Sequence, residues 1–264
     1  MTLEFLDASG AVLKRYSNHR PADAYDQPAE WTDREAPVET IPAEAGANRF
    51  AWNMHREEPT PLPGAVYGEG LPRGPLVRPG HYQVRLTFRN EVSVQPLEVI
   101  LDPRLSASVK AADLAALETL ALSVGRDIDA LHRAVNEMRD LRAKIVTLQK
   151  WAANDAAAQP VLASADRFLK QVAAIEEELV QVRLAASEDT LRYPVKLNEQ
   201  FAYLSNVLDG DAPPTVPQRE VAAMLHERLE TQLARWRSLA SSELPALNEL
   251  LHRQGIPRLS VAGR

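Results

Sequence analysis

Proline is distributed very unevenly along this chain, and its distribution constrains the fold more than any other feature. Most of the 19 prolines lie before Arg104, and none occurs from Leu105 to Gln159. Proline lacks a backbone N–H donor and disrupts the interior of a helix. The sequence therefore predicts strands and loops in a first domain, residues 1–104, and helices in a second domain, residues 105–257, followed by a tail, 258–264.

Short apolar runs at the start of the chain predict a hairpin. Residues 3–6 and 12–16 flank the turn sequence Asp-Ala-Ser-Gly at 7–10, which is typical of two antiparallel strands. Further on, Phe50, Trp52 and Met54 alternate with small or polar residues. This period of two predicts a half-buried strand.

Two later segments give the clearest strand patterns. Residues 81–88 alternate apolar and polar side chains, and Asn90-Glu91 can turn the chain into residues 92–101. Because the second segment contains Pro96, we expect it at a sheet edge or with a bulge. Several short strands separated by turn sequences predict an antiparallel β-sandwich.

After residue 108 the apolar period changes to that of helices. Apolar residues separated by three and four positions predict a first helix of about 42 residues, roughly 60 Å long, which ends before Asn154. A second helix is expected from Pro160, a favoured first-turn position. Its apolar positions are Ala165, Phe168, Val172, Ile175, Leu179 and Val182.

Two more helices are expected in the remainder of the chain. One spans about 194–209 and ends at Gly210, and the other begins at Pro217 and ends near Gly255, with a kink expected at Pro245. Helices of this length cannot bury their apolar faces against a small sandwich. They therefore predict an α+β protein with a three- or four-helix bundle, whose long apolar face also offers a route to a homodimer.

Composition excludes several classes of function. The formal net charge of −6 argues against a nucleic-acid-binding surface, which needs a basic patch. No apolar run approaches the roughly 20 residues of a membrane span. The absence of cysteine excludes disulfides and thiolate chemistry.

The first fifteen residues lack the basic-then-apolar pattern of a signal peptide. We therefore expect this chain to remain in the compartment where it is made, unless it derives from a longer one.

The sequence identifies no catalytic, cofactor-binding or metal-binding residue. None of the six histidines forms an i, i+4 pair with another histidine, and the HExxH and GxSxG motifs are absent. The acidic run Glu176-Glu177-Glu178 is typical of a solvated helix face. Acidic residues between 23 and 35 lack the ordered spacing of a calcium loop.

Aromatic residues in the predicted loops are the remaining candidates for binding. Tyr25, Trp31 and Tyr67 lie among polar, proline-rich residues, where exposed rings commonly contact sugars or proteins. For Trp31 and Tyr25 we favour the other interpretation, in which the rings fold back onto the sandwich. By their spacing, Trp52 and Trp236 belong to the core.

Several motifs occur in an order that resembles a known family. They are Asp7-Ala8-Ser9-Gly10, Gly46 to Met54, Gly74 to Leu86, Asp102-Pro103-Arg104, Tyr193 to Asn198 and Ala246-Leu247-Asn248. Together they resemble the C-terminal region of bacterial proteins described as glycosyl hydrolases with BNR or sortilin-like β-propeller repeats. The resemblance implies an immunoglobulin- or fibronectin-like sandwich, a helical tail, and a periplasmic or secreted full-length protein. The propeller that would hold a hydrolase site is absent, so no catalytic residue is carried over.

Three functions follow from these observations. The first is a non-catalytic accessory module that docks on a propeller, a sister subunit or a cell-envelope partner. The second is carbohydrate binding through Tyr25, Trp31 or Tyr67. The third is glycoside hydrolysis, which needs two carboxylates about 5 to 10 Å apart, and the sequence does not single out such a pair. We favour the first.

Overall fold

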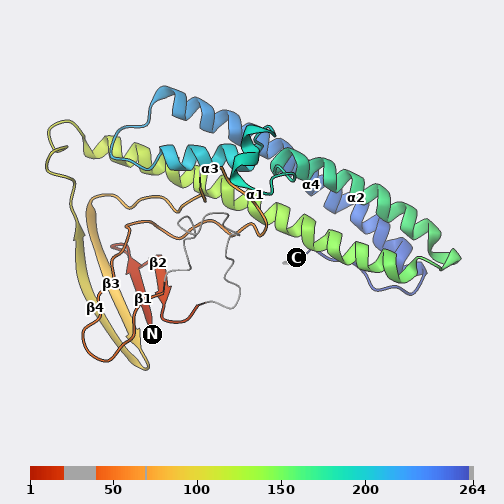
Figure 1. Cartoon of the computed structure of the whole chain (residues 1–264), viewed down its shortest axis with the longest axis horizontal. Coiled ribbons are helices and arrows are strands. Elements are labelled where there is room, and N and C mark those ends of the chain that lie inside the picture. The colour runs from red at the N-terminus through yellow and green to blue at the C-terminus, as the bar shows by residue number, and fades with distance from the viewer. Residues whose placement is uncertain (21–39, 69, 262–264) are drawn as a thin grey trace.

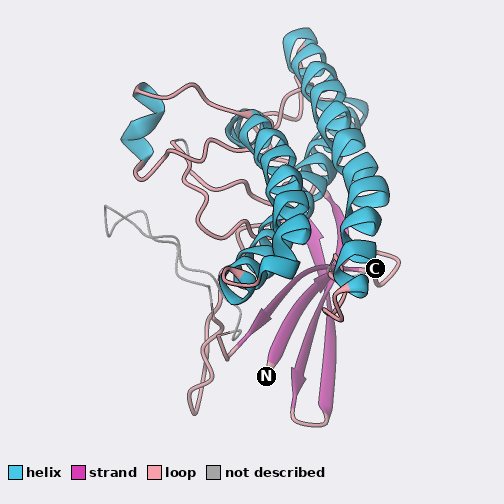
Figure 2. Ribbon diagram, turned by 90° about the vertical axis from the view of Figure 1, so that its right-hand side faces the viewer, coloured by secondary structure: helices cyan, strands magenta, loops and turns pink. Residues whose placement is uncertain are grey.

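The computed structural model describes residues 1–20, 40–68 and 70–261. Within them the chain forms one four-stranded antiparallel sheet, four α-helices and two short 3-10 helices. Figure 1 shows the sheet beneath one end of an elongated group of helices, and Figure 2 shows the same arrangement turned by 90°. The predicted α+β class is confirmed.

The first two strands form the predicted hairpin. β1 (Thr2–Leu6) pairs with β2 (Val12–Ser17). Asp7 Oδ1 accepts hydrogen bonds from the backbone N–H of Ser9 (2.9 Å) and of Ala11 (3.0 Å), which closes the turn with a side chain. Gly10 has a φ of 88°, a left-handed conformation that glycine adopts without steric cost.

The sheet has the strand order β2-β1-β3-β4, so β1 is paired on both sides. β3 (Gly80–Phe88) pairs with β4 (Glu91–Val99) over the whole length of both strands. β4 is an edge strand, as the presence of Pro96 predicts, because an edge position leaves the missing N–H without consequence. The predictions for these two strands are confirmed.

An irregular segment covers one face of the sheet. Trp52 stacks on Phe5 at a centroid distance of 4.0 Å, and Phe50 lies 4.6 Å from the ring of Tyr16. The strand predicted over residues 50–54 is wrong, since these residues are not in a strand. Met54 has a φ of 61°, which breaks an extended conformation. The alternating apolar residues pack on a sheet without joining it.

The opposite face of the sheet carries a group of ion-paired side chains. Glu4 receives hydrogen bonds from Arg15 Nε (2.8 Å) and from Arg85 Nε (2.6 Å). The Arg85 guanidinium is the main cause that lowers the pKa of Glu4, and that of Arg15 adds to it. Neighbouring Val92 and Val94 on β4 are exposed. A sandwich needs a second sheet, and the described residues form the one sheet given above.

The first two helices carry the predicted apolar faces. α1 (Ala111–Ala152) has a row of buried residues along its length, and α2 (Gln159–Leu179) buries Ala165, Phe168, Val172, Ile175 and Leu179. The prediction that this apolar row extends to Val182 is wrong. α2 ends at Leu179, and Val182 is 51% exposed.

The next two helices form a hairpin. After the 3-10 helices η1 (Ala156–Ala158) and η2 (Ser187–Leu191), α3 (Leu197–Val207) leads into α4 (Val216–Arg253). Thr215 caps α4 by accepting the N–H of Gln218 through its side chain, as threonine does at helix starts. Pro245 lies inside α4.

The four helices share one apolar core. α1 contacts α2, α3 and α4, and α4 also contacts α2 and α3. Trp236 is buried on α4, and its Nε1 donates to Glu137 of α1 at 3.0 Å, which satisfies the indole N–H. Trp151 at the end of α1 is 73% exposed.

A segment of the first predicted domain, residues 56–67, is bonded to α1 and packs into the helical core. Arg56 pairs with Glu118 at 2.6 Å, and the hydroxyl of Thr60 donates to Asp129 at 2.5 Å. Leu62, Ala65 and Tyr67 belong to the apolar core of the helices. Residues of the first predicted domain therefore contribute to the core of the second.

The described part of the tail also packs on the helices. Asn248 of α4 bonds to both the N–H and the C=O of Leu259, and Val261 is buried. None of the helices in the described residues is sufficiently long and apolar to cross a membrane.

Candidate binding groove between α3 and α4

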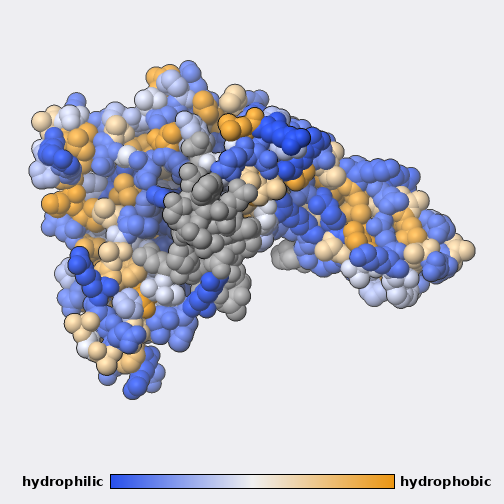
Figure 3. Space-filling view, in the orientation of Figure 1, coloured by the Kyte–Doolittle hydropathy of each residue, from blue (hydrophilic) through white to orange (hydrophobic). Residues whose placement is uncertain are grey.

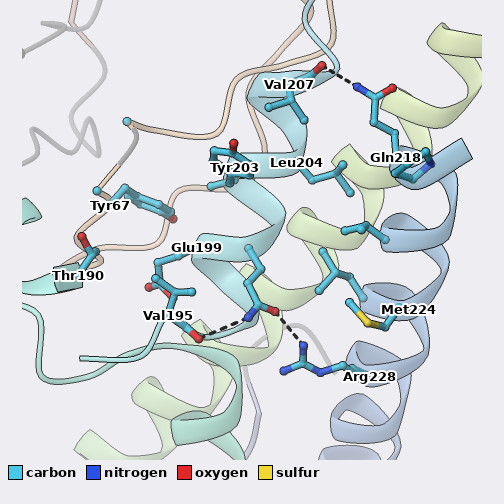
Figure 4. A pocket seen from close by; sticks show the side chains of 17 residues that line it. Tyr67, Thr190, Val195, Glu199, Tyr203, Leu204, Val207, Gln218, Met224 and Arg228 are labelled. Atoms are coloured by element: carbon cyan, nitrogen blue, oxygen red, sulfur yellow. Dashed lines mark hydrogen bonds between the residues drawn. The ribbon is translucent and has the colours of Figure 1, made fainter. Parts of the chain in front are cut away.

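A cavity of about 530 Å³ opens between α3 and the first turns of α4. Figure 4 shows its side chains, which come from both helices and from two connections that close one end. Those connections contain Tyr67, on the loop before the sheet's third strand, and Thr190, in η2. A cavity of this size is within the range of ligand-binding sites.

Large apolar side chains line the groove without being covered. Tyr203 is 56% exposed and Val207 43% exposed on α3, and on α4 Val221 is 39% and Met224 48% exposed. Figure 3 shows that apolar residues reach the surface over the helices among polar ones. A concentration of exposed apolar side chains around a hollow marks a site of interaction.

The polar groups of the groove hold one another in place. Arg228 Nη1 donates to Gln200 Oε1 at 2.9 Å, and Gln218 Nε2 donates to the carbonyl of Val207 at 3.0 Å. Figure 4 marks these bonds with dashed lines. Since the bonds link α3 to α4, the walls of the groove are kept at a fixed separation.

Glu199 is the one carboxylate that lines the groove among the residues described. It is 7% exposed, and its Oε2 accepts the N–H of Lys196 at 2.8 Å at the start of α3. Burial raises the pKa of this carboxyl, although backbone N–H groups and the Asn198 amide oppose the rise. Burial has this effect because it disfavours the charged form.

A buried polar network lies behind Tyr67. The Tyr67 hydroxyl lies 3.2 Å from His132 Nε2 and 3.3 Å from Asn198 Oδ1, and His132 Nδ1 contacts the carbonyl of Thr60 at 2.6 Å. Burial lowers the pKa of His132. These bonds satisfy groups from a loop and two helices, so the network fixes the inner wall of the groove.

Of the three aromatic residues predicted as contacts, Tyr67 is the one that the structure describes. It is only 7% exposed, with its hydroxyl directed into the network and its ring at the edge of the groove. Tyr25 and Trp31 lie outside the described residues. No group of three or more His, Cys, Asp or Glu that could hold a metal occurs in residues 1–20, 40–68 and 70–261.

The groove was not among the sites predicted from the sequence, although the sequence contains a pattern for it. Pro217, Val221, Met224 and Arg228 are spaced four, three and four residues apart, beside the buried row of α4 that begins with Ala222. A second row at helical spacing on one helix indicates a second contact surface. The longer buried row on the same helix gives the stronger signal.

Comparisons of the chain with protein-family models, with curated proteins and with solved structures found no match. The resemblance to the C-terminal region of BNR and sortilin-like propeller proteins therefore stays a prediction.

Proposed function

We propose that this chain is a non-catalytic interaction module that binds a partner protein through the groove between α3 and α4. The observation that carries this proposal is the row of exposed apolar side chains, Tyr203, Val207, Val221 and Met224, around a cavity in which Gln200 and Gln218 are already hydrogen-bonded. Exposed apolar surface of this kind is costly in water and is favourable when a partner covers it.

The same proposal includes the finer architecture expected from the sequence. We take the four helices to act as a bundle and the sheet to be one layer of an immunoglobulin- or fibronectin-like sandwich. Leu86 and Phe88 support the second part, because they are exposed on the face that carries buried Phe5. A second layer would cover them.

The resemblance to propeller proteins suggests where such a module works. The module would lie next to a β-propeller domain or subunit and would bind a second protein, so that it links the two. The propeller itself, a sister subunit or a second copy of this chain are the candidate partners. Carbohydrate binding is the weaker alternative, because the hydroxyl of Tyr67 is already engaged with His132 and Asn198. Glycoside hydrolysis is weaker still, since no observation selects a pair of carboxylates.

Site-specific photo-crosslinking in the native host tests the proposal. Tyr203, in the groove, is replaced by a photo-crosslinking phenylalanine analogue, and Val92, exposed on β4, is replaced in a control. The proposal predicts a discrete protein adduct from position 203 that position 92 does not give. The same adducts from both positions, or no adduct from 203, would contradict it, as would glycan turnover by the isolated chain.

A further inference from the structure

The apolar residues of the groove follow the period of helix-to-helix packing. On α4, Pro217, Val221, Met224 and Arg228 line the groove at intervals of four, three and four residues, and on α3 Tyr203 and Val207 are four apart. Intervals of three and four place side chains in one row along a helix. Two such rows, side by side, form holes that receive the side chains of a third helix.

The backbone of the groove excludes an added strand. Both walls are helices, whose N–H and C=O groups are used within the helix except at its ends. The side-chain amides of Gln200 and Gln218 are already bonded. These two amides are therefore not free to bind a sugar, whereas the apolar face of a helix needs no polar partner.

The length of the α4 row sets the length of the contact. Residue 228 lies eleven residues after residue 217, which corresponds to about 16 Å along a helix axis. A partner helix that fills this length presents about three turns. Such a segment carries three or four apolar residues on one face.

A single positive charge stands at one end of the row. Arg228 is exposed, and among the described residues it makes a hydrogen bond with Gln200 and no salt bridge. This hydrogen bond orients the guanidinium, and within residues 1–20, 40–68 and 70–261 no carboxylate pairs with it. A partner that places an acidic side chain opposite this end would complete an ion pair.

We infer that the occupant of the groove is an amphipathic α-helix of a partner protein, with apolar residues at intervals of three and four and an acidic residue that meets Arg228. The inference rests on the proposed function, because it names the kind of partner that the same groove binds. It assigns the two helices the role of a receptor for a third.

Titration calorimetry with synthetic peptides tests the inference on the full chain. The probe is a helical peptide of about 18 residues, long enough to form a helix with capping, with leucines in one row and a glutamate at one end of it. A second peptide has lysine in place of that glutamate, and a third has glutamine in place of the leucines. We expect the glutamate peptide to bind, the lysine peptide to bind about fivefold more weakly, and the glutamine peptide not to bind.

Variants locate the binding and test the charge. Val221→Glu should weaken the glutamate peptide at least about tenfold, whereas Val92→Glu, which adds the same charge to an exposed valine on the sheet, should not. Arg228→Glu should reverse the preference, so that the lysine peptide binds more tightly than the glutamate peptide. Circular dichroism checks that each variant keeps its helices.

Other outcomes overturn the inference in separable ways. If no peptide binds while position 203 still gives a specific crosslinked adduct, the helix is wrong and the interaction module stands. If concentration-dependent self-association is lost in Val221→Glu and kept in Val92→Glu, the occupant is a second copy of this chain. If the peptides bind without sensitivity to Val221→Glu, or without a reversed preference in Arg228→Glu, the groove does not recognise an acidic amphipathic helix.

Discussion

At Gly74 the surrounding backbone leaves no room for a side chain. A Cβ atom at this position would lie 2.1 Å from the carbonyl oxygen of Arg56 and 2.3 Å from that of Glu57. The carbonyl of Gly74 in turn lies 2.7 Å from His55 Nδ1. Because the opposing atoms belong to the backbone, they cannot move aside as a flexible side chain does.

Gly74→Ala should therefore lower the free energy of unfolding by about 1–3 kcal/mol. Gly210→Ala is the control, because no atom lies within 4 Å of the added methyl group, and its effect should stay within about 0.5 kcal/mol. Urea unfolding measures both. Equal effects would show that the close approach at Gly74 is not a constraint.

His132 makes the stability of the molecule depend on pH. Burial lowers its pKa in the folded state below the ordinary value of 6.5. Between the folded and the unfolded pKa, the unfolded chain binds more protons, so the free energy of unfolding decreases as the pH falls below 6.5. The slope from one such group is at most about 1.4 kcal/mol per pH unit.

His132→Gln should reduce this slope between pH 7.5 and pH 5.5. The exposed His252, replaced by Gln, is the control and should leave the slope unchanged. Urea unfolding at several pH values gives the comparison. A slope that is equal in all three proteins would mean that His132 is not kept neutral by the fold.

At the scale of elements, α3 begins with a buried carboxyl. Burial raises the pKa of Glu199 above its ordinary value of 4.5. Between pH 4.5 and the raised pKa of the folded state, the folded chain therefore binds more protons at this carboxyl than the unfolded chain does. The free energy of unfolding decreases as the pH rises through this range. The group stabilises the fold most fully at acidic pH.

Glu199→Gln should remove this contribution and make stability less dependent on pH above 4.5. The glutamine side chain keeps an oxygen that accepts the N–H of Lys196, so the start of α3 remains capped. Glu220→Gln, on the exposed side of α4, serves as the matched control. Thermal unfolding from pH 5 to pH 8 checks the prediction, and a steeper dependence in Glu199→Gln would contradict it.

The regular elements could be predicted from the sequence because their signals are local. The apolar row along α1, the hairpin around Asp7 and the edge position of β4 each follow from spacing or from a single proline. The strand predicted over residues 50–54 is absent from the structure. Alternation of apolar and polar side chains indicates which side chains are buried, but it does not show whether the backbone is hydrogen-bonded in a sheet.

The candidate groove could be predicted only in part. Val221 and Met224 lie in a recognisable row, but its partner row on α3 belongs to a different helix. Their meeting depends on how the hairpin of α3 and α4 packs on α1. Tyr67 was assigned to an exposed loop, because nothing local shows that this loop enters the helical core. Long-range packing of this kind leaves no periodic signal.

At the scale of the whole molecule, the segment before β3 joins the sheet to the helices. Leu62 and Tyr67 lie in the helical core, Arg56 pairs with Glu118, and Arg78 donates to the carbonyl of Gly210 at 2.8 Å. These contacts connect the sheet to α1 and to the connection between α3 and α4. Residues of the first predicted domain therefore pack in the core of the second and bond to its helices and connections.

We expect the sheet and the helices to unfold in one transition. The fluorescence of Trp52, which stacks on the sheet, should follow the same urea curve as the helical circular dichroism signal. A variant with phenylalanine at Trp31, Trp151 and Trp236 isolates that fluorescence. Coincident curves indicate one cooperative unit, and two separate midpoints would show independent domains.

We have proposed that the groove between α3 and α4 receives a helix of a partner protein. Hydrogen exchange measured by mass spectrometry, with and without the glutamate peptide, shows which residues the bound helix covers. We expect slower exchange in residues 197–207 and 216–228, and unchanged exchange in β1 to β4 and in the distal half of α2. Slower exchange confined to the sheet, or no change anywhere while the peptide binds, would contradict it.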